Sequence, residues 1–326
     1  MNRIKKVAFT AAPTAGYEYP EIMDYIRSLG FEAVFRPDLT LDPKDVVPRL
    51  KDVDAVLAGG DWFTAENLEQ LPNIKMIARF GVGYDKVDLK KATEMGIPVT
   101  NTPGMLGHVA ELVLGMILAL NRGIIICDRA VRNGIWFPDF YGRDLEGKKI
   151  GLIGFGAIAQ KVARLLAGFD CEIFAYDLFF NEKAAEQLNV KQADYEKIIT
   201  ECDVISLHVP LTEQTRGMVN AEFLKKMKKT AILINTARGA VVDETALYQA
   251  LKNKEIRGAA TDVYGHEPAG KDNPLFTLDN IVVTPHVAAM TLEGNFRMGK
   301  AAADELAAFN EDKPLRFLVN KDCKYE

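Results

Sequence analysis

The chain has 326 residues, of which 48% are hydrophobic and 26% are charged, a balance typical of a folded globular protein and not of a disordered one. Its formal net charge of −5 argues against a protein that binds nucleic acid or another polyanion. At roughly 100–200 residues per domain, this length predicts two domains.

Short apolar runs alternate with helical patterns in the first third of the chain. The runs have the length and composition of β-strands, and Tyr19–Leu29 and Leu89–Met95 have the periodicity of amphipathic helices. This alternation predicts βαβ units and a parallel sheet with helices on its faces. The predicted strands are Lys6–Thr10, Glu32–Phe35, Ala55–Leu57, Lys75–Arg79 and Pro98–Thr100.

A second, more regular series begins near Lys149. Helical patterns separate most of its strands, among them Gln160–Leu166, Ala221–Met227 and Glu244–Leu251. Six strands in two halves predict a doubly wound sheet of the kind that binds dinucleotides. The predicted strands are Lys149–Gly154, Glu172–Tyr176, Asp203–His208, Ala231–Asn235, Gly258–Asp262 and Ile281–Thr284.

Proline and glycine in the segment Asn101-Thr-Pro-Gly104 interrupt the pattern and indicate a domain boundary. The apolar helix predicted after it, over Val109–Leu120, then belongs to the second domain. The helical stretch Leu292–Asn310 could return the chain to the first. We therefore predict an α/β protein of two doubly wound parallel-sheet domains with a cleft between them, residues 1–101 with 291–326 and residues 102–290.

A glycine-rich segment, Gly154-Phe-Gly-Ala-Ile-Ala159, lies directly after a predicted strand and before a predicted helix. Gly154 allows a tight turn, and Gly156 lets the backbone approach a pyrophosphate at the helix N-terminus. The next strand ends at Asp177, roughly 20 residues further on, where a carboxylate binds the adenosine ribose and repels a 2′-phosphate. Because no arginine follows directly, we predict NAD and not NADP. The predicted contacts are Gly154, Gly156, Ala157, Ile158 and Asp177.

Three loops after late strands carry side chains suited to hydride chemistry on a 2-oxo acid. Such a reaction needs a cation for the carboxylate and the C2 carbonyl, a proton donor that is a base in reverse, and a group that orients it. Arg238, Glu267 and His286 follow the fourth, fifth and sixth strands of the second series, at the edge where open α/β sheets bind ligands. An arginine matches a carboxylate, and a glutamate on a histidine ring fixes its tautomer.

These motifs resemble those of the D-isomer-specific 2-hydroxyacid dehydrogenases, and most of all the phosphoglycerate dehydrogenase branch. Together they are highly specific, and they extend over most of the chain, from about residue 50 to about residue 320. The matching segments are Arg79-Phe-Gly-Val-Gly-Tyr-Asp, Asn101-Thr-Pro-Gly, Val109-Ala-Glu, the glycine-rich segment, Asn235-Thr-Ala-Arg-Gly, Glu267-Pro268 and Thr284-Pro-His286.

The resemblance implies an NAD-dependent enzyme that interconverts a small D-2-hydroxy acid and its 2-oxo acid. The first domain would be a flavodoxin-like substrate-binding domain and the second a Rossmann-type NAD-binding domain. Arg238 would bind the substrate carboxyl and carbonyl groups, with His286 as the acid–base and Glu267 as its partner. The remaining implied substrate contacts are the amides of Val82 and Gly83, with Arg79 either a further contact or a surface cation.

Further cofactor contacts follow from the same resemblance. Asp262 would hold the nicotinamide carboxamide, and Pro210, Thr212, Thr236 and Ala237 lie where the family contacts the cofactor. The family's habits and the apolar helix after Asn101 also favour a homodimer.

Two departures from the family pattern affect the expected activity. Ala157 stands where many members have an arginine, so a phosphate contact could be lost and cofactor binding weakened. The segment Ala58-Gly-Gly-Asp61 lacks an arginine common in phosphoglycerate enzymes, which argues against a phosphorylated substrate. The substrate alternatives are 3-phosphoglycerate, hydroxypyruvate, glyoxylate or a larger 2-oxo acid. An NAD-sensing corepressor on the same fold is the alternative function.

The other histidines and the tryptophan receive structural interpretations. His208 and His266 are expected to be structural or solvated, and His108 to begin the buried helix, with a position facing the cleft as its alternative. Trp136 is expected to pack locally or, as in relatives, to reach a neighbouring subunit.

The cysteines lie far apart and form no CxxC pair, so we expect neither a zinc site nor a disulfide framework. Buried free thiols in a reducing cytoplasm are the interpretation. The apolar run Val7–Ala12 is too short for a signal peptide, and Val109–Leu120 is about half a membrane span. We therefore expect a cytoplasmic protein with no membrane contact and no metal.

Overall fold

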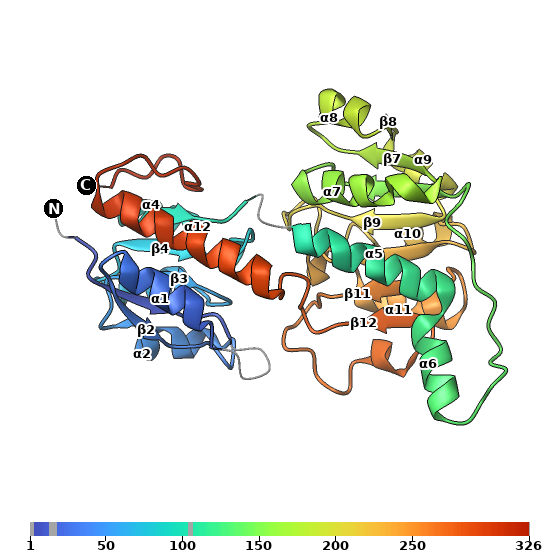
Figure 1. Ribbon diagram of the computed structural model, residues 1–326, viewed down its shortest axis with the longest axis horizontal. Coiled ribbons are helices and arrows are strands. Elements are labelled where there is room, and N and C mark those ends of the chain that lie inside the picture. Colours follow the sequence, from blue (N-terminus) through green and yellow to red (C-terminus); the bar gives the residue numbers. More distant parts are fainter. Residues whose placement is uncertain (1–2, 13–17, 104–106, 326) are drawn as a thin grey trace. The chain divides into compact units, whose positions relative to one another are not determined.

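The computed structural model describes residues 3–12, 18–103 and 107–325, and the chain divides into two compact units (Figure 1). The first unit combines Met1–Met105 with Ala289–Glu326, and the second runs from Leu106 to Ala288. The sequence-based boundaries were drawn after residues 101 and 290. Gly104, part of the segment used for the first of them, lies outside the described residues.

The first unit contains a five-stranded parallel sheet in which the chain order reverses at its second strand. Its strands are fully buried at β3 and β4, as expected for a parallel sheet covered on both faces. The order across the sheet is β2 (Glu32–Phe35), β1 (Lys6–Phe9), β3 (Ala55–Ala58), β4 (Met76–Arg79) and β5 (Val99–Thr100).

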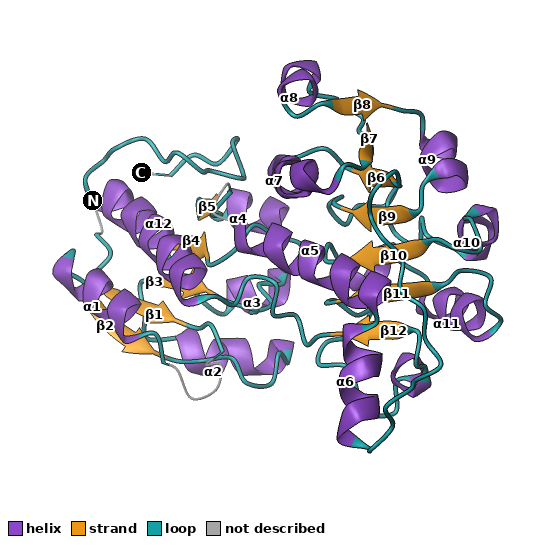
Figure 2. Cartoon of the chain, turned by 45° about the vertical axis from the view of Figure 1, so that its right-hand side comes forward, coloured by secondary structure: helices purple, strands orange, loops and turns teal. Residues whose placement is uncertain are grey.

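Helices cover both faces of this sheet (Figure 2). Helix α1 (Pro20–Ser28) packs with α12 (Leu292–Asn310), which places the end of the chain in the core of the first unit. The other face packs against α2 (Val46–Leu50), α3 (Ala65–Glu69) and α4 (Leu89–Glu94). The short helix η1 (Pro43–Asp45) precedes α2.

The second unit contains a seven-stranded parallel sheet, so the predicted number of six was wrong. The additional strand, β8, lies at one edge and pairs with β7 only. The chain order reverses at β6, which lies between β9 and β7. The order is β12 (Ile281–Val283), β11 (Gly258–Thr261), β10 (Ile232–Asn235), β9 (Val204–Leu207), β6 (Lys149–Ile153), β7 (Glu172–Tyr176) and β8 (Val190–Gln192).

Two helical layers enclose this second sheet, and the predicted doubly wound architecture is confirmed in both units. One layer holds α5 (Gly107–Arg122), α7 (Ala157–Leu166) and α8 (Glu182–Gln187), and the other holds α9 (Tyr195–Glu201), α10 (Ala221–Lys226) and α11 (Glu244–Lys252). Helix α6 (Ile124–Arg132) has no buried residue. The remaining short helices are η2 (Ala167–Phe169), η3 (Gly239–Val241) and η4 (Pro274–Thr277).

Two expectations about side chains need correction. Trp136 is 75% exposed, so it does not pack locally. All four cysteines are free, but only Cys202 and Cys323 are buried, whereas Cys127 and Cys171 are half-buried. Within the described residues no single helix is long and apolar enough to cross a membrane; α5 and α6 qualify only as a pair, and that pair is bent by 61°.

Candidate active site

The glycine-rich turn after β6 has the geometry that its glycines predict. Gly154 has φ +91°, and a Cβ there would lie 2.5 Å from the carbonyl oxygen of His208. Only glycine fits both the conformation and this close approach. The turn therefore packs directly against the end of β9, at the point where the strand order reverses and open α/β sheets bind ligands.

The N-terminus of α7 presents open amide groups. Its N-cap, Gly156, provides no side-chain cap, and a Cβ at Gly156 would meet no atom within 4 Å. The amides of Gly156, Ala157 and Ile158 donate no hydrogen bond to any residue that the structure describes. Open N–H groups at the positive end of a helix dipole fit a pyrophosphate, so these residues fit a dinucleotide.

Asp177, at the end of β7, is held beside this turn. Its Oδ2 accepts a hydrogen bond from the Phe155 amide at 2.6 Å, and its Oδ1 accepts one from the Phe179 amide at 2.7 Å. The carboxylate is therefore fixed next to the glycine turn, where the sequence predicts contact with the ribose.

The other predicted cofactor residues lie in loops after β9 and β10. The Pro210–Thr212 loop is closed by Thr215, whose Oγ1 donates to the Pro210 carbonyl at 2.6 Å and accepts from the Thr212 amide at 2.8 Å. The Ala237 amide donates to Asn235 Oδ1 at 3.1 Å. Thr236 Oγ1 is buried without a hydrogen-bond partner in the described part of the chain.

The predicted acid–base pair is formed. His286 Nδ1 lies 2.8 Å from Glu267 Oε2, and the side chain of Glu267 is 19% exposed against 46% for His286. Since Nδ1 faces the glutamate, Nε2 is the ring nitrogen that can exchange a proton with a substrate.

Asp262 anchors the segment that carries His286, a role that sequence reasoning missed. The buried carboxylate accepts hydrogen bonds from Thr284 Oγ1 at 2.5 Å and from the amides of Val287 at 2.8 Å and Ala288 at 2.9 Å. Its carbonyl accepts from the His286 amide at 2.8 Å. The chain thus holds His286 at φ +56° through one buried residue at the end of β11.

Tyr264 is a second supporting residue that the sequence did not single out. Its amide donates to Glu267 Oε1 at 3.1 Å, and its hydroxyl donates to the Thr284 carbonyl at 2.9 Å. Burial, followed by the nearby charge of Asp262, raises the pKa of Tyr264 to about 12, so the phenol remains a donor at neutral pH. It links the loops of Glu267 and His286.

The Arg238 turn packs against the Glu267 loop. A Cβ on Gly239 would lie 1.9 Å from the Tyr264 carbonyl carbon and 2.4 Å from the Gly265 nitrogen, so the two backbones touch. Arg238 Nη1 donates to the Ala237 carbonyl at 2.8 Å. Loops after β10, β11 and β12 therefore meet at one edge of the second sheet, as the sequence predicted.

In the first unit, Arg79 is 7% exposed, which excludes the alternative of a surface cation. Its Nε donates to the Gly83 carbonyl at 3.1 Å. The Val82 carbonyl accepts from Asn101 Nδ2 at 2.9 Å, whereas the Val82 and Gly83 amides donate no hydrogen bond within the described residues. Both amides are therefore available for a substrate anion.

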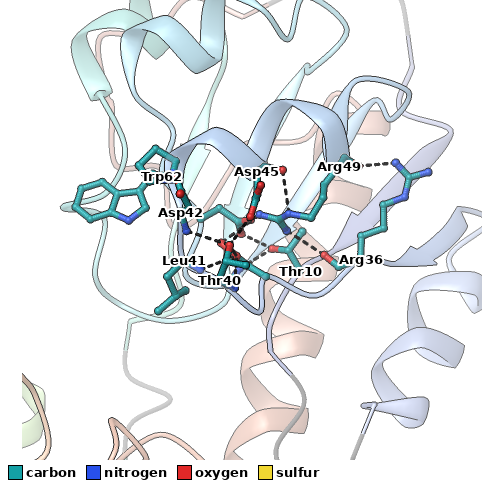
Figure 3. Close-up of polar contacts among 12 residues, drawn as sticks. Thr10, Arg36, Thr40, Leu41, Asp42, Asp45, Arg49 and Trp62 are labelled. Carbon is teal, nitrogen blue, oxygen red and sulfur yellow. Dashed lines mark hydrogen bonds and ion pairs between the residues drawn. The ribbon is translucent and has the colours of Figure 1, made fainter. Parts of the chain in front are cut away.

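A buried ionic network lies at the same edge of the first sheet (Figure 3). Arg49 Nη2 lies 2.8 Å from Asp61 Oδ1 and 3.1 Å from Asp38 Oδ2. Thr10 donates to Asp61, and Arg49 Nη1 donates to the Arg36 carbonyl at 3.1 Å. Burial raises the pKa of Asp61, although Thr10 and Arg49 oppose the shift. The network links the ends of β1, β2 and β3.

The remaining histidines divide as the sequence suggested in part. His266 is exposed, and His108 is buried at the start of α5. His208 has a buried Nε2, and burial lowers its pKa to about 4, so it is structural and not solvated. No group of three or more metal-ligating side chains occurs among the described residues.

Residues 114–288 match a family model described as the NAD binding domain of D-isomer specific 2-hydroxyacid dehydrogenases. A glyoxylate reductase of Korarchaeum cryptofilum is 41% identical over 286 residues, which cover 86% of each chain. A D-3-phosphoglycerate dehydrogenase of Archaeoglobus fulgidus is 37% identical over 305 residues, which cover 92% of this chain but 57% of that enzyme. The structure of D-lactate dehydrogenase from Escherichia coli has a TM-score of 0.83 and 30% identity, with 96% of this chain and 99% of that one covered.

These likenesses agree with the geometry. The matched family model includes the glycine turn, Asp177, the Arg238 turn and the His286–Glu267 pair. The predicted cofactor and enzyme class are confirmed, and the corepressor alternative loses its support. The chain thus belongs to the D-isomer specific 2-hydroxyacid dehydrogenase family and is one of its NAD-dependent oxidoreductases.

Proposed function

We propose that this dehydrogenase reduces a small, unphosphorylated 2-oxo acid, of the glyoxylate or hydroxypyruvate type, to the D-2-hydroxy acid. The observation that carries the proposal is the 2.8 Å contact between His286 and Glu267, which leaves Nε2 for the substrate. The match to a glyoxylate reductase over 86% of that enzyme supports this substrate type, because the phosphoglycerate dehydrogenase extends well beyond the matched region.

His286 is proposed to move the proton of the reaction. When bound, NADH supplies the hydride that adds to C2 of the oxo acid. The Nε2 atom of His286 donates a proton to the developing alkoxide, and it accepts that proton in the reverse direction. Glu267 holds the ring through Nδ1, so the proton-donating nitrogen stays directed at the substrate.

Arg238 is proposed to bind the substrate carboxylate and to polarise the C2 carbonyl. Its planar guanidinium suits a carboxylate, which accepts two parallel hydrogen bonds. The contact of Gly239 with the Tyr264–Gly265 backbone supports this role, because it keeps the arginine near the loop of Glu267. The amides of Val82 and Gly83 are proposed to bind the carboxylate as well.

The preference for an unphosphorylated substrate is argued from the arginines of the first unit. Arg49 is engaged by Asp38 and Asp61, and Arg79 donates to the Gly83 carbonyl. A phosphate needs charged or amide donors at its binding position, and both arginines already make interactions inside the protein. Asp61 itself would repel a phosphate.

Initial rates of NADH oxidation with a panel of 2-oxo acids test the proposal. We expect turnover of glyoxylate and hydroxypyruvate, with a kcat/KM for 3-phosphohydroxypyruvate at least about tenfold lower, equivalent to about 1.4 kcal/mol. His286→Ala should lower kcat by roughly 10²–10⁴-fold while NADH still binds. The exposed His266, replaced by alanine, is the matched control. Full activity of the His286 variant would assign the proton to another group.

A homodimer is proposed from an exposed apolar segment. Helix α6 and the loop after it expose large apolar side chains that water contacts unfavourably, so a second copy of the chain is the expected cover. The exposed side chains are Ile124, Ile125, Val131, Ile135, Trp136, Phe137 and Tyr141. A cytoplasmic location is proposed because all four cysteines are free thiols, and cell fractionation tests it.

A further inference from the structure

Three consecutive peptide groups after β4 are held in the same manner. They join Gly81 to Val82, Val82 to Gly83, and Gly83 to Tyr84, and we call them the amide row. The carbonyl of each accepts a hydrogen bond from a residue on or directly after β4 or β5. The three bonds are Thr102 N to Gly81 O at 2.9 Å, Asn101 Nδ2 to Val82 O at 2.9 Å, and Arg79 Nε to Gly83 O at 3.1 Å.

The direction of these carbonyls decides where the amides point. In a trans peptide the N–H is antiparallel to the C=O of the same planar group. Because the carbonyls face donors from the ends of β4 and β5, the N–H groups of Val82, Gly83 and Tyr84 face the other side. Within residues 3–12, 18–103 and 107–325, none of these three amides donates a hydrogen bond. Successive N–H groups of this kind form a concave anion site, called a nest.

Glycine makes the row possible at its first position. Gly81 has φ +141°, a conformation that side chains rarely adopt, and its amide donates to Thr102 Oγ1 at 3.0 Å. Thr102 therefore both donates to and accepts from Gly81, and it fixes the start of the row.

We propose that Asn101 and Arg79 are positioning residues that hold the amide row so that three amides, including that of Tyr84, bind one carboxylate of the substrate. The inference rests on the proposed function, which uses the amides of Val82 and Gly83 alone. Arg79 acts through the Gly83 carbonyl and does not touch the substrate. Its buried charge lies near Asp61 and adds positive potential behind the row. The ligand class is a monocarboxylate anion.

Replacement of Asn101 separates this role from a merely structural one. Asn101→Ala removes the donor to the Val82 carbonyl, and we expect the KM for glyoxylate to rise about tenfold, as for one net hydrogen bond. The kcat and the Kd for NADH should change little, since the cofactor residues belong to the second unit. Asn73→Ala is the matched control, because Asn73 Nδ2 also donates to a backbone carbonyl of this unit, that of Lys51 at 3.2 Å. A KM equal to that of the unmodified enzyme would overturn the inference.

A binding experiment keeps the inference separate from the proposed function. Oxamate, an unreactive monocarboxylate, is added to the ¹⁵N-labelled enzyme with NADH, and the amide signals of Val82, Gly83 and Tyr84 are followed. We expect all three to shift, and to shift less in Asn101→Ala. A Tyr84 signal that stays in place while the other two move would exclude the three-amide site. Shifts of all three without turnover of any 2-oxo acid would support the nest and reject the proposed substrate.

Arg79→Gln is the weaker variant, because loss of a buried cation also leaves the charge of Asp61 uncompensated and destabilises the unit. A drop in stability there without a change in KM would count against its positioning role.

Discussion

At the residue scale, Asp177 serves the cofactor site and the local backbone through one carboxylate. The Phe155 and Phe179 amides each donate to one of its oxygens, so the side chain holds the turn that begins at Gly154. Removal of this carboxylate would loosen the turn and also abolish the charge that disfavours a 2′-phosphate. The two effects need two variants.

Asp177→Asn keeps one acceptor for the backbone but removes the negative charge. We expect the ratio of kcat/KM for NADH to that for NADPH to fall by about tenfold, equivalent to about 1.4 kcal/mol. Asp177→Ala should also raise the Kd for both cofactors, because neither amide retains an acceptor. Steady-state rates with both cofactors measure these values. An unchanged ratio in Asp177→Asn would show that the ribose lies elsewhere.

His208 predicts a dependence of stability on pH. Burial disfavours its imidazolium form and lowers its pKa from 6.5 to about 4. The unfolded chain therefore binds this proton at a higher pH than the folded chain does, so the contribution is complete above pH 6.5 and is lost as the pH falls toward 4. We expect up to about 3 kcal/mol of unfolding free energy to be lost over this interval.

Urea unfolding at several pH values between these limits measures the loss. His208→Gln should show a smaller decrease with pH, whereas His266→Gln, which changes an exposed histidine, should retain the original dependence. Equal dependence in all three proteins would contradict the assignment to His208.

At the element scale, strongly patterned segments were predicted with the bounds that the structure has. Glu32–Phe35, Glu172–Tyr176 and Leu292–Asn310 are examples. Strand β8 was missed because Val190-Lys-Gln contains a single apolar residue and needs only one partner at the edge of the sheet. Helix α6 was missed because it buries no residue within the chain, so no core-facing stripe marks it.

The candidate site divides in a similar way. Motifs with a fixed spacing predicted the glycine turn and the His286–Glu267 pair, which local geometry largely determines. Tyr264 and Asn101 could not be predicted, because each acts through a backbone group of another segment and leaves no local pattern. The anchoring role of Asp262 had one signal, a carboxylate at the end of a buried strand.

The contact between η3 and the Tyr264–Gly265 backbone predicts an intolerant position. Gly239→Ala would place a Cβ 1.9 Å from a backbone carbon that cannot move independently, so the Arg238 and Glu267 loops must separate. We expect a loss of about 1–3 kcal/mol of unfolding free energy and a fall in kcat/KM. Gly168→Ala is the control, because a Cβ there meets nothing within 4 Å. Normal activity and stability in Gly239→Ala would mean that the loops are not in contact.

At the scale of the whole molecule, the two units differ in how the chain builds them. The second is continuous, whereas the first needs α12 to complete its core, where Ala302, Ala303 and Leu306 are buried. The exposed apolar segment at α6 belongs wholly to the second unit. A second copy could therefore be bound by that unit alone.

Charge placed on α6 tests the proposed dimer. Ile124→Glu combined with Ile125→Glu puts like charges on a surface that two copies would share, and we expect the mass from light scattering to fall from twice the chain's 36.1 kDa to that of one chain. Leu178→Glu, a change of equal type at an exposed residue after β7, should leave the mass unaltered. A double variant that keeps the larger mass would locate the interface elsewhere.

The return of α12 to the first unit also bears on synthesis. Ribosomes release the strands of that unit first, yet the helix that closes its core emerges last, after the whole of the second unit. The earlier strands must therefore wait, with the apolar surface that α12 will cover still open to solvent or chaperones, while the later unit can already fold. Nascent chains truncated before Leu292 are the species in which this delay would be seen as protease sensitivity of the first unit alone.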